Sequence, residues 1–562
     1  MTPKPKNQPT IAIIGGGLSG LTLALELKKK LGLEKTVTIY EKHPHEVGGT
    51  WRDNYYPGCA CDVPSHWYSL STELNPDWTS KYSGQAEIQK YWQGIYKKHN
   101  LAKQTKFDST FIKGEWNAAE QGYTVEFKRK DGSTFTIKCD VLVSCIGGFS
   151  TPLDKPHGMK GIDSFKGPVF HSARWRKDVD LKGKRVAVIG NGCSAAQFIP
   201  ILAEEKSTQV INFSRTPSWF APRDQKNYSG VTKAAFRYIP GVMRTYRNFI
   251  AITSDSRFVV WWLQFSTLRH YVEEYMANYI RQNSPEKYHD FLVPKYPFGC
   301  KRVIMDPGYL QCLFRSNVEL ITDGIATITE KGLLGKSGKE YEFDVLILGT
   351  GFDVSEVGLG INVVGRNGKT VTEQWKEQNG PQAYLGTTIS NYPNFYSVLG
   401  PNVASGTASV VYSTEAQVNY IVKMIEPMVK YGVKSFECKV EVEQQYNEYI
   451  QNRLKGTVWN GGCTSYYKLG EKVVATFPGP TSEFVWRTRK PKFENFTQTG
   501  GTVRVAARHA QKKIAKWFTL FALIALFRKY GYKRIRNEVV LWLLMRYQEV
   551  IPIINRVRGR VQ

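Results

Sequence analysis

Short apolar runs and helix-like stretches alternate along the chain in two separate places. Residues 10–14 (TIAII) are an apolar run, and a glycine-rich turn, a helix-like stretch (21–31) and a second apolar run, TVTIYEK (36–42), follow. The stretch KRVAVIG (184–190) starts the same series again. Short apolar runs are typical of strands buried on both faces of a parallel sheet. The pattern predicts an α/β fold with two Rossmann-like dinucleotide-binding domains.

The first turn has the glycine spacing of a dinucleotide fingerprint, with Gly15, Gly17 and Gly20. Glycines let the backbone approach a pyrophosphate, whose charge meets the amino-terminus of the following helix. Glu41 comes about 20 residues later, where an acid accepts hydrogen bonds from ribose hydroxyls. A lone G-x-G-x-x-G is weak evidence, but the two flanking strands and the acid together predict a nucleotide site.

The second turn repeats this logic with one difference in charge. Gly190, Gly192 and Ala195 follow the apolar run, and the expected strand VINFSR (210–215) ends at Arg215. Arg215 occupies the position that Glu41 has in the first unit. An acid there favours an unphosphorylated ribose, whereas an arginine accommodates a 2′-phosphate. The first site is therefore predicted to bind FAD and the second NADPH; the alternative for Arg215 is a solvated surface side chain.

Two further regions differ in texture from the nucleotide units. Residues 221–297 carry many aromatic residues at helical spacing and almost no strand signal, which predicts a helical insertion whose aromatic side chains serve packing. Residues 513–562 hold two apolar runs separated by RKYGYKRIRN, with 11 Lys or Arg against 2 Asp or Glu, a net +9. A run of about 14 residues gives a helix of about 21 Å, short of the ~30 Å hydrocarbon core. This tail is expected to be helical and either to bind a membrane surface or to pack on the protein.

Composition narrows the class of protein. The chain has 562 residues and a formal net charge of +27, from 76 Lys and Arg against 49 Asp and Glu. Such a charge could indicate nucleic acid or an anionic membrane as partner, but a lysine-rich solvated surface is the preferred explanation, and no nucleic acid is expected. The nine cysteines, without a secretory signal, predict reduced thiols in an intracellular protein, cytoplasmic or peripherally membrane-associated. No metal-ligand spacing is present.

The segment between the two turns carries a third motif. FKGPVFHSARW (165–175) has the form F-x-G-x-x-x-H-x-x-x-W, and GGTW (48–51), NYYPG (54–58), CDVPS (61–65) and PFGCKR (297–302) accompany it. Together they resemble the type I (class B) Baeyer–Villiger monooxygenases of the flavin-containing monooxygenase superfamily. The resemblance covers roughly residues 10–480. Two positions depart from the family pattern: Arg176 stands where Pro or Asp is usual, and Tyr466 where Trp is usual.

The resemblance implies two cofactors and a cycle. NADPH would reduce FAD, O2 would add to the flavin C4a atom, and the peroxide would attack a ketone to give an ester or lactone. Arg302 would be the catalytic guanidinium. Asp62 would lie near the flavin and support this arginine. The other residues implied are Gly49, Thr50, Trp51 and Tyr68 for FAD, Thr216 and Lys301 for NADP, and the signature residues Phe165, Gly167, His171 and Trp175.

Alternative functions remain open at this point. A flavin-containing monooxygenase that oxidises amine or sulfide heteroatoms would share nearly all these motifs, and only Trp175, Asp62 and Arg302 argue against it. A disulfide reductase of the two-dinucleotide kind lacks its C-x-x-C, and a non-enzymatic basic binder leaves Glu41 and Arg215 unexplained. The expected domains are FAD-binding (1–150 and 346–512), NADP-binding (151–220 and 298–345), the helical insertion (221–297) and the basic apolar tail (513–562).

Overall fold

A computed structural model describes residues 8–155, 158–354, 361–406, 408–508, 519–521 and 523–525. Contacts divide the chain into two units, one of Met1–Pro491 with Asn495–Gly501 and a second of Lys492–Glu494 with Thr502–Gln562. The fold and the site described below belong to the first unit. The expected tail lies, except for 519–521 and 523–525, outside the described residues. Within the part of the chain that is described, no helix has both the length and the apolar character of a membrane span.

The first glycine turn lies in a parallel sheet. Strand β1 (Ile11–Ile14) pairs in parallel with β2 (Val37–Tyr40) on one side and β7 (Val141–Ser144) on the other. Every residue of β1 and β7 is buried, as the unbroken apolar runs predict. The sheet order is β19–β7–β1–β2–β3, where β19 is Phe395–Ser397 and β3 is Thr105–Lys106. The chain thus completes this sheet with a strand from beyond residue 390.

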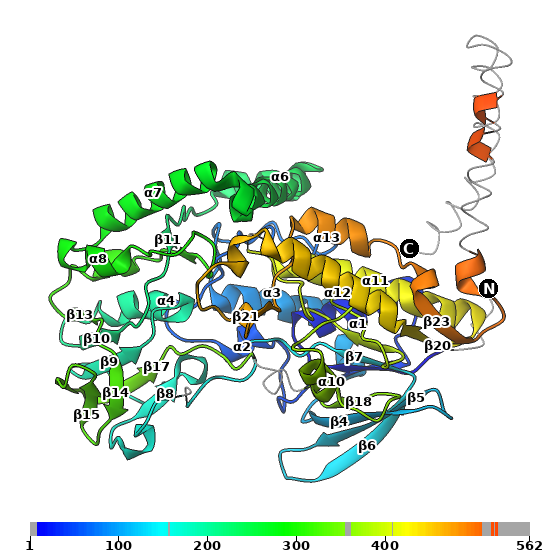
Figure 1. The fold of residues 1–562 in the computed structure, drawn as a ribbon, viewed down its shortest axis with the longest axis horizontal. Helices are drawn as coiled ribbons and strands as arrows, with labels where there is room; N and C mark the ends of the chain where they lie inside the picture. Colours follow the sequence, from blue (N-terminus) through cyan, green and yellow to red (C-terminus); the bar gives the residue numbers. More distant parts are fainter. Residues whose placement is uncertain are drawn as a thin grey trace. The chain divides into compact units, whose positions relative to one another are not determined.

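A second parallel sheet holds the second turn. Strand β9 (Arg185–Ile189) lies between β10 (Gln209–Phe213) and β17 (Val345–Leu348). The order is β13–β10–β9–β17–β8, with β13 at Val318–Ile321 and β8 at Val169–His171 (Figure 1). Strand β10 ends two residues before Arg215, earlier than the sequence predicts. The two sheets confirm the α/β fold with two Rossmann-like units.

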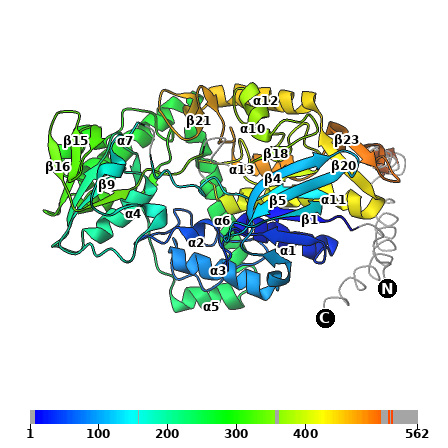
Figure 2. The ribbon, with the colours of Figure 1, turned by 90° about the horizontal axis from the view of Figure 1, so that it is seen from below.

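Smaller sheets flank these two, and a four-stranded one beside β1 is visible in Figure 2. It contains a hairpin of β5 and β6, which pair antiparallel. The smaller sheets are β18–β4–β5–β6 (Val363–Val364, Thr110–Asn117, Gly122–Lys128, Thr134–Cys139), β14–β15–β16 (Ile325–Ile328, Gly332–Gly335, Glu340–Glu342), β11–β12 (Phe220–Ala221, Ile304–Met305), β20–β23 (Val433–Cys438, Phe496–Gly500) and β21–β22 (Lys468–Leu469, Lys472–Val473).

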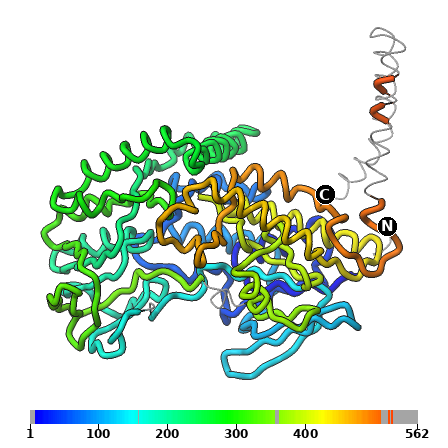
Figure 3. The backbone as a smooth tube through the Cα atoms, in the orientation of Figure 1, coloured from blue at the N-terminus to red at the C-terminus, as the bar shows by residue number. Residues whose placement is uncertain are grey.

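A helix follows each glycine turn, as predicted: α1 (Leu18–Leu31) follows the first and α4 (Cys193–Leu202) the second. Helix α1 packs against α11, a helix from the carboxy-terminal part of the first unit. Figure 3 shows how the chain comes back to its amino-terminal part: it passes from blue through cyan and green, and the yellow segment lies beside the blue one again. Outside the insertion the helices are α1 (Leu18–Leu31), α2 (Thr50–Asp53), α3 (Gln85–Lys98), α4 (Cys193–Leu202), α9 (Tyr309–Cys312), α10 (Val371–Glu377), α11 (Val410–Tyr431), α12 (Val440–Lys455) and α13 (Thr481–Thr488).

The insertion is helical, as predicted. Its aromatic side chains pack on one another: the rings of Phe236 and Tyr246 stack at 5.3 Å between centroids, and the His66 ring meets Phe236 at 4.6 Å. These contacts support the packing prediction for part of the aromatic content, whereas Tyr238, Phe249, Tyr271 and Tyr275 are exposed. The helices are α5 (Gly230–Tyr238), α6 (Val242–Ser256), α7 (Ser266–Asn283) and α8 (His289–Leu292).

Two connections between the parallel sheets run side by side. Pro152 and Phe352 form an antiparallel bridge, and the Leu153 amide donates to the Gly351 carbonyl at 3.0 Å. The Thr350 hydroxyl donates to the Leu153 carbonyl at 2.8 Å. The chain therefore enters and leaves the second sheet through one pair of neighbouring segments.

Candidate functional site

The first turn leaves an uncapped helix amino-terminus. Gly15 has φ +104°, which favours glycine, and a Cβ at Gly20 would lie 2.0 Å from the Gly15 carbonyl oxygen. Gly17 is the N-cap residue of α1; no side chain caps this end, and no acid lies in the first turn. The amide groups there are the donors that an anion needs. The three fingerprint glycines thus form an anion cradle.

Glu41 lies beside this cradle at the end of β2, and its side chain is buried. Its Oε2 accepts from the Gly16 amide at 2.7 Å, and its Oε1 pairs with Arg52 at 2.9 Å. The carboxylate is therefore fixed next to the turn, where the fingerprint requires it. Arg52 is a partner that the sequence reasoning missed, although it directly follows the GGTW motif.

The GGTW segment closes over the first turn. The Gly48 amide donates to the Gly16 carbonyl at 3.0 Å, and a Cβ at Gly49 would come within 3.0 Å of the Gly17 Cα. The Trp51 indole donates to the Tyr68 hydroxyl at 3.0 Å, and the Thr50 hydroxyl accepts from the Asn54 amide at 3.0 Å. The structure therefore brings Gly49, Thr50, Trp51 and Tyr68 together with the fingerprint glycines, as expected.

The second turn repeats the cradle. Gly190 has φ +112°, and a Cβ there would lie 2.3 Å from the Gly349 carbonyl oxygen. Gly192 is the N-cap residue of α4, again with no side-chain cap and no acid in the first turn. The buried Ala195 faces Gly349, where a Cβ would sit 3.2 Å from that of Ala195. This helix end also offers free amide donors to an anion.

Two cations lie at the edge of the second cradle. Arg215 and Thr216 are exposed just after β10, and the Thr216 carbonyl accepts from the Asn191 side chain at 3.0 Å. Burial lowers the pKa of Lys301, and the like charge of Arg215 lowers it further. The Lys301 ammonium also lies 4.9 Å from the centroid of the Tyr296 ring. Bringing two like charges together is unfavourable without an anion, so the pair suits a phosphate.

The signature segment connects the second sheet with its surroundings. Phe165 and Trp175 are buried, and a Cβ at Gly167 would lie 2.4 Å from the Asp344 carbonyl oxygen. His171 ends β8, and its Nδ1 accepts from the Ala173 amide at 3.0 Å, which fixes the tautomer that carries hydrogen on Nε2. Burial lowers the pKa of His171, so the ring is neutral near pH 7.

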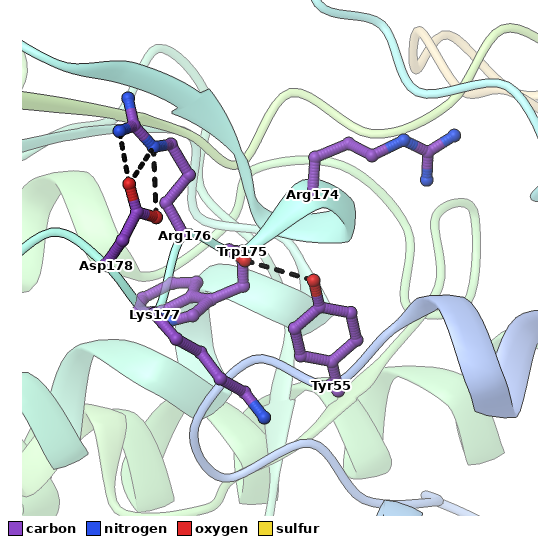
Figure 4. Close-up of a pocket in the computed structure, with 6 residues that line it drawn as sticks. All are labelled: Tyr55, Arg174, Trp175, Arg176, Lys177 and Asp178. Atoms are coloured by element: carbon purple, nitrogen blue, oxygen red, sulfur yellow. Dashed lines mark hydrogen bonds and ion pairs between the residues drawn. The ribbon is translucent and has the colours of Figure 1, made fainter.

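A hollow of about 530 Å³ is lined by Tyr55 and by residues 174–178, at the end of the signature segment (Figure 4). In it the Tyr55 hydroxyl donates to the Trp175 carbonyl at 3.1 Å, and Arg176 pairs with Asp178. The Trp175 ring packs against Phe198 of α4 at 5.3 Å between centroids. Arg176, which departs from the family pattern, is therefore a surface residue with an acidic partner, and the Trp175 ring contributes to packing.

Asp62 and Arg302 form the ion pair that the resemblance implies. The Asp62 carboxylate accepts from Arg302 Nε at 3.0 Å and from Nη2 at 2.5 Å, although 240 residues separate the two in the chain. Both side chains are about a quarter exposed, at 27% and 26%. The charge of Asp62 raises the pKa of Arg302 well above its ordinary value. A permanent cation is thus held in a partly solvated position.

Tyr466 and Tyr467 lie within electrostatic reach of Arg302. Both tyrosines add to the rise in the pKa of Arg302, Tyr467 more than Tyr466. Their rings contact each other at 4.5 Å, and Tyr466 also meets Phe149 at 6.0 Å. Tyr466, which stands where the family usually has tryptophan, therefore lies within electrostatic reach of the guanidinium.

The prediction that all nine cysteines are reduced thiols was wrong for two of them. Cys300 and Cys463 form a disulfide, with their Cα atoms 6.3 Å apart and 163 residues between them in sequence. The sequence spacing could not reveal this, because only the packing of the two loops brings the thiols together. The remaining seven cysteines, Cys59, Cys61, Cys139, Cys145, Cys193, Cys312 and Cys438, are free thiols.

A further contact missed from the sequence joins the NYYPG segment to α4. Gln197 accepts from the Tyr56 hydroxyl at 2.9 Å and donates to the Ala60 carbonyl at 2.9 Å. A Cβ at Gly58 would lie 2.7 Å from the Gln197 carbonyl oxygen. The motif glycine Gly58 thus permits a close approach between the Asp62 loop and the second nucleotide unit.

The chain is similar in sequence to proteins of one known family. The model of the flavin-binding monooxygenase-like family matches residues 8–359. A Baeyer–Villiger monooxygenase of Pseudomonas aeruginosa is 35% identical over 500 residues, 87% of this chain and 90% of the relative. The chain belongs to the flavin-binding monooxygenase-like family, on its Baeyer–Villiger branch.

Two solved structures extend the likeness to the whole fold. The structure of an oxidized steroid monooxygenase bound to NADP is 27% identical, has a TM-score of 0.75, and covers 88% of this chain and 100% of its own. The structure of OTEMO in complex with FAD and NADP is 25% identical with a TM-score of 0.78, at the same coverage. The chain thus has the same overall fold as these two structures over 88% of its length.

Proposed function

We propose that this protein is an NADPH- and O2-dependent flavoprotein monooxygenase that inserts oxygen next to a ketone carbonyl. Ketone, O2, NADPH and a proton would give an ester or lactone, NADP⁺ and water. FAD and NADPH are its cofactors. The observation that carries the proposal is the Asp62–Arg302 ion pair, which joins a loop following the first cradle to a segment flanking the second.

The first cradle is the proposed FAD site. The uncapped amino-terminus of α1 would hold the pyrophosphate, and Glu41 would meet the ribose hydroxyls. The close approach of Gly49 to Gly17 brings the GGTW segment, which we assign to the same site, directly against the turn. The FAD residues we assign are Gly15, Gly17, Gly20, Glu41, Gly49, Thr50, Trp51, Asp62 and Tyr68. Once bound, FAD supplies the redox and oxygen chemistry.

The second cradle is the proposed NADPH site. The amino-terminus of α4 would hold the pyrophosphate, while Arg215 and Lys301 would share the 2′-phosphate. The mutual repulsion of the two cations supports this, because a dianionic phosphate would relieve it. The residues we assign are Gly190, Gly192, Ala195, Arg215, Thr216 and Lys301, with Phe165, Gly167, His171 and Trp175 as the segment that connects this site to the first.

Arg302 is the proposed catalytic residue. Negative charge develops on oxygen when a nucleophile attacks a carbonyl, and a fixed cation stabilises it more than solvent does. Arginine suits this role because its guanidinium stays charged and offers several donors in a rigid fork. Asp62 occupies two of these donors, Nε and Nη2, and thereby fixes the orientation of the rest.

Product analysis tests the proposal. Purified protein with bound FAD is incubated with NADPH, O2 and either a cyclic ketone or an alkyl aryl sulfide, and the products are identified by mass spectrometry with ¹⁸O₂. We expect a lactone carrying one ¹⁸O atom. Sulfoxide without lactone would instead favour heteroatom oxidation, which shares the same cofactor sites.

We also propose the FAD-binding, NADP-binding, insertion and tail regions with the boundaries predicted from the sequence. For residues 513–562 we propose in addition that they bind a membrane surface. Apolar runs flanked by cations fit interfacial binding to anionic lipid. Flotation with vesicles of phosphatidylcholine and phosphatidylserine, comparing the full chain with a version ending at residue 508, tests the tail. If both versions partition alike, the membrane role is excluded and the +9 charge serves another purpose.

A further inference from the structure

The Cys300–Cys463 disulfide lies beside the residues of the proposed reaction. Cys300 is two positions before Arg302, and Cys463 is three positions before Tyr466. Cys300 is fully buried, whereas Cys463 is 8% exposed. The crosslink therefore joins the segment that carries the catalytic guanidinium to the loop that carries the two tyrosines beside it.

Each of the two segments is otherwise anchored to its own surroundings. The Ile304 amide donates to the Trp219 carbonyl at 2.9 Å, which holds the arginine segment to the second nucleotide unit. The Val474 amide donates to the Tyr467 carbonyl at 2.8 Å, which holds the tyrosine loop to the β21–β22 hairpin. Among the described residues, no hydrogen bond or ion pair joins segment 297–303 to segment 461–468.

Phe298 of the arginine segment and Tyr467 of the tyrosine loop belong to the same buried hydrophobic cluster, so the disulfide acts alongside shared apolar packing. A Cβ built at Gly461 would lie 3.9 Å from the Pro297 side chain, and a Cβ built at Gly462 would have no neighbour within 4 Å. Apolar contacts still allow local opening, whereas a covalent bond fixes the distance between the two loops.

We propose that Cys300 and Cys463 are positioning residues for the oxygenation, in that their disulfide holds the segment of Arg302 and the loop of Tyr466 and Tyr467 at a fixed distance. The inference rests on the proposed function. With the bond intact, the guanidinium, Asp62 and the tyrosines form one fixed group. With the bond broken, the tyrosine loop moves away from Arg302, and reduced oxygen leaves as hydrogen peroxide before it reaches the ketone. A misplacement of about 1 Å at such a centre can cost up to ~10²-fold in rate.

The bond also makes oxygen transfer responsive to a dithiol reductant. A thiolate of the dithiol attacks Sγ of the more exposed Cys463, the Cys300–Cys463 bond breaks, and the Cys300 thiolate leaves and takes up a proton. The second thiol of the reductant then attacks the reductant sulfur in the mixed disulfide, which closes the oxidised dithiol ring and releases Cys463 as a thiol. Two electrons pass from the dithiol, which is oxidised, to the cystine, which is reduced.

Thiol counting is the first test. Protein denatured without reductant and alkylated should take up seven labels, and nine after treatment with dithiothreitol, with the peptides of Cys300 and Cys463 accounting for the difference. Nine labels without reductant would overturn the proposal. This count is independent of catalysis, so it separates a wrong disulfide from a wrong assignment of the reaction.

Coupling is the second test. Cys300→Ala, Cys463→Ala and the double variant are compared with Cys312→Ala, which removes a buried thiol outside the disulfide. The readouts are oxygenated product and hydrogen peroxide per NADPH, with whichever ketone or sulfide the parent oxygenates. We expect the three disulfide variants to lose a similar share of product, because one bond is broken in each, while the KM for NADPH stays near that of the parent.

A purely structural bond gives a different result. Lower melting temperatures with unchanged product per NADPH would overturn the positioning role, and so would a loss of product in Cys312→Ala equal to that in the disulfide variants. If the variants fail to fold, dithiothreitol added to the parent enzyme serves instead. Product per NADPH should then fall as the label count rises from seven to nine, and product that stays constant over that rise would overturn the proposal.

Discussion

Lys301 and Arg302 are adjacent in the chain, but their charges act on different partners. Arg302 pairs with Asp62 through two hydrogen bonds, whereas Lys301 lies over the Tyr296 ring within the electrostatic reach of Arg215. One dipeptide thus contributes to both the proposed cofactor selection and the proposed oxygen transfer. Substitutions at the two positions should therefore separate NADPH use from product formation.

Arg302→Ala should keep FAD and accept hydride from NADPH, yet form almost no ester and release hydrogen peroxide. Removing one fixed stabiliser of developing charge costs about 10²–10³ in rate. Asp62→Ala should show the same defect more mildly, and the double variant should lose less than the two single effects combined, because the pair acts as a unit. Ester formation at the parent rate by Arg302→Ala would remove this residue from the mechanism.

Arg215→Gln should raise the KM for NADPH and leave that for NADH nearly unchanged. Hydrogen bonds to charged groups contribute about 1.5–3 kcal/mol, which corresponds to about 10- to 10²-fold. Arg315→Gln, at an exposed arginine after α9, is the matched control and should behave as the parent. Equal use of both cofactors by the parent would contradict the assignment of a 2′-phosphate site.

The pH dependence of NADPH use should depend on Lys301. The pKa of Lys301 is lowered below that of an ordinary lysine. Its positive charge, which attracts phosphate, is therefore present at low pH. This charge is lost as the pH rises through the lowered pKa. The kcat/KM for NADPH should therefore fall on the alkaline side. Lys301→Arg keeps the charge and should shift this decline to higher pH, and an identical profile in both proteins would exclude Lys301 from the site.

Gly20→Ala should destabilise the protein and weaken its retention of FAD. The new methyl group would lie 2.0 Å from the Gly15 carbonyl oxygen, and overpacking of this kind costs about 1–3 kcal/mol. Gly94→Ala is the control, since Gly94 is exposed in the middle of α3 and has no neighbour within 4 Å of a Cβ position. That variant should be more stable by about 0.5–1 kcal/mol. Thermal unfolding followed by flavin fluorescence compares the two.

The elements that the sequence predicted well are those encoded by local patterns. The apolar runs of β1 and β9, with the glycine turns behind them, need only a few neighbouring residues to be recognised, and their parallel pairings confirm them. Strand β10 was predicted to reach Arg215 but ends at Phe213. The strand ends where the buried apolar side chains end, and Arg215 is exposed.

The relationships that the sequence did not predict connect distant parts of the chain. The Cys300–Cys463 bond and the Tyr56–Gln197 hydrogen bond depend on how loops of different elements pack, and no periodicity records that. The Asp62–Arg302 pair is equally distant, yet the resemblance to a known family implied it. Knowledge of relatives thus supplied the long-range contact that spacing alone could not.

The bridge between Pro152 and Phe352 has a consequence for how such a protein can be built. Because the chain leaves and rejoins at one place, the roughly 200 residues between the two positions begin and end side by side. Segments with adjacent ends can be inserted into a host, removed or exchanged without rethreading the remainder. Swapping this stretch between relatives at those two points should yield chimaeric oxygenases in which the preference for a nicotinamide cofactor is inherited separately from the flavin.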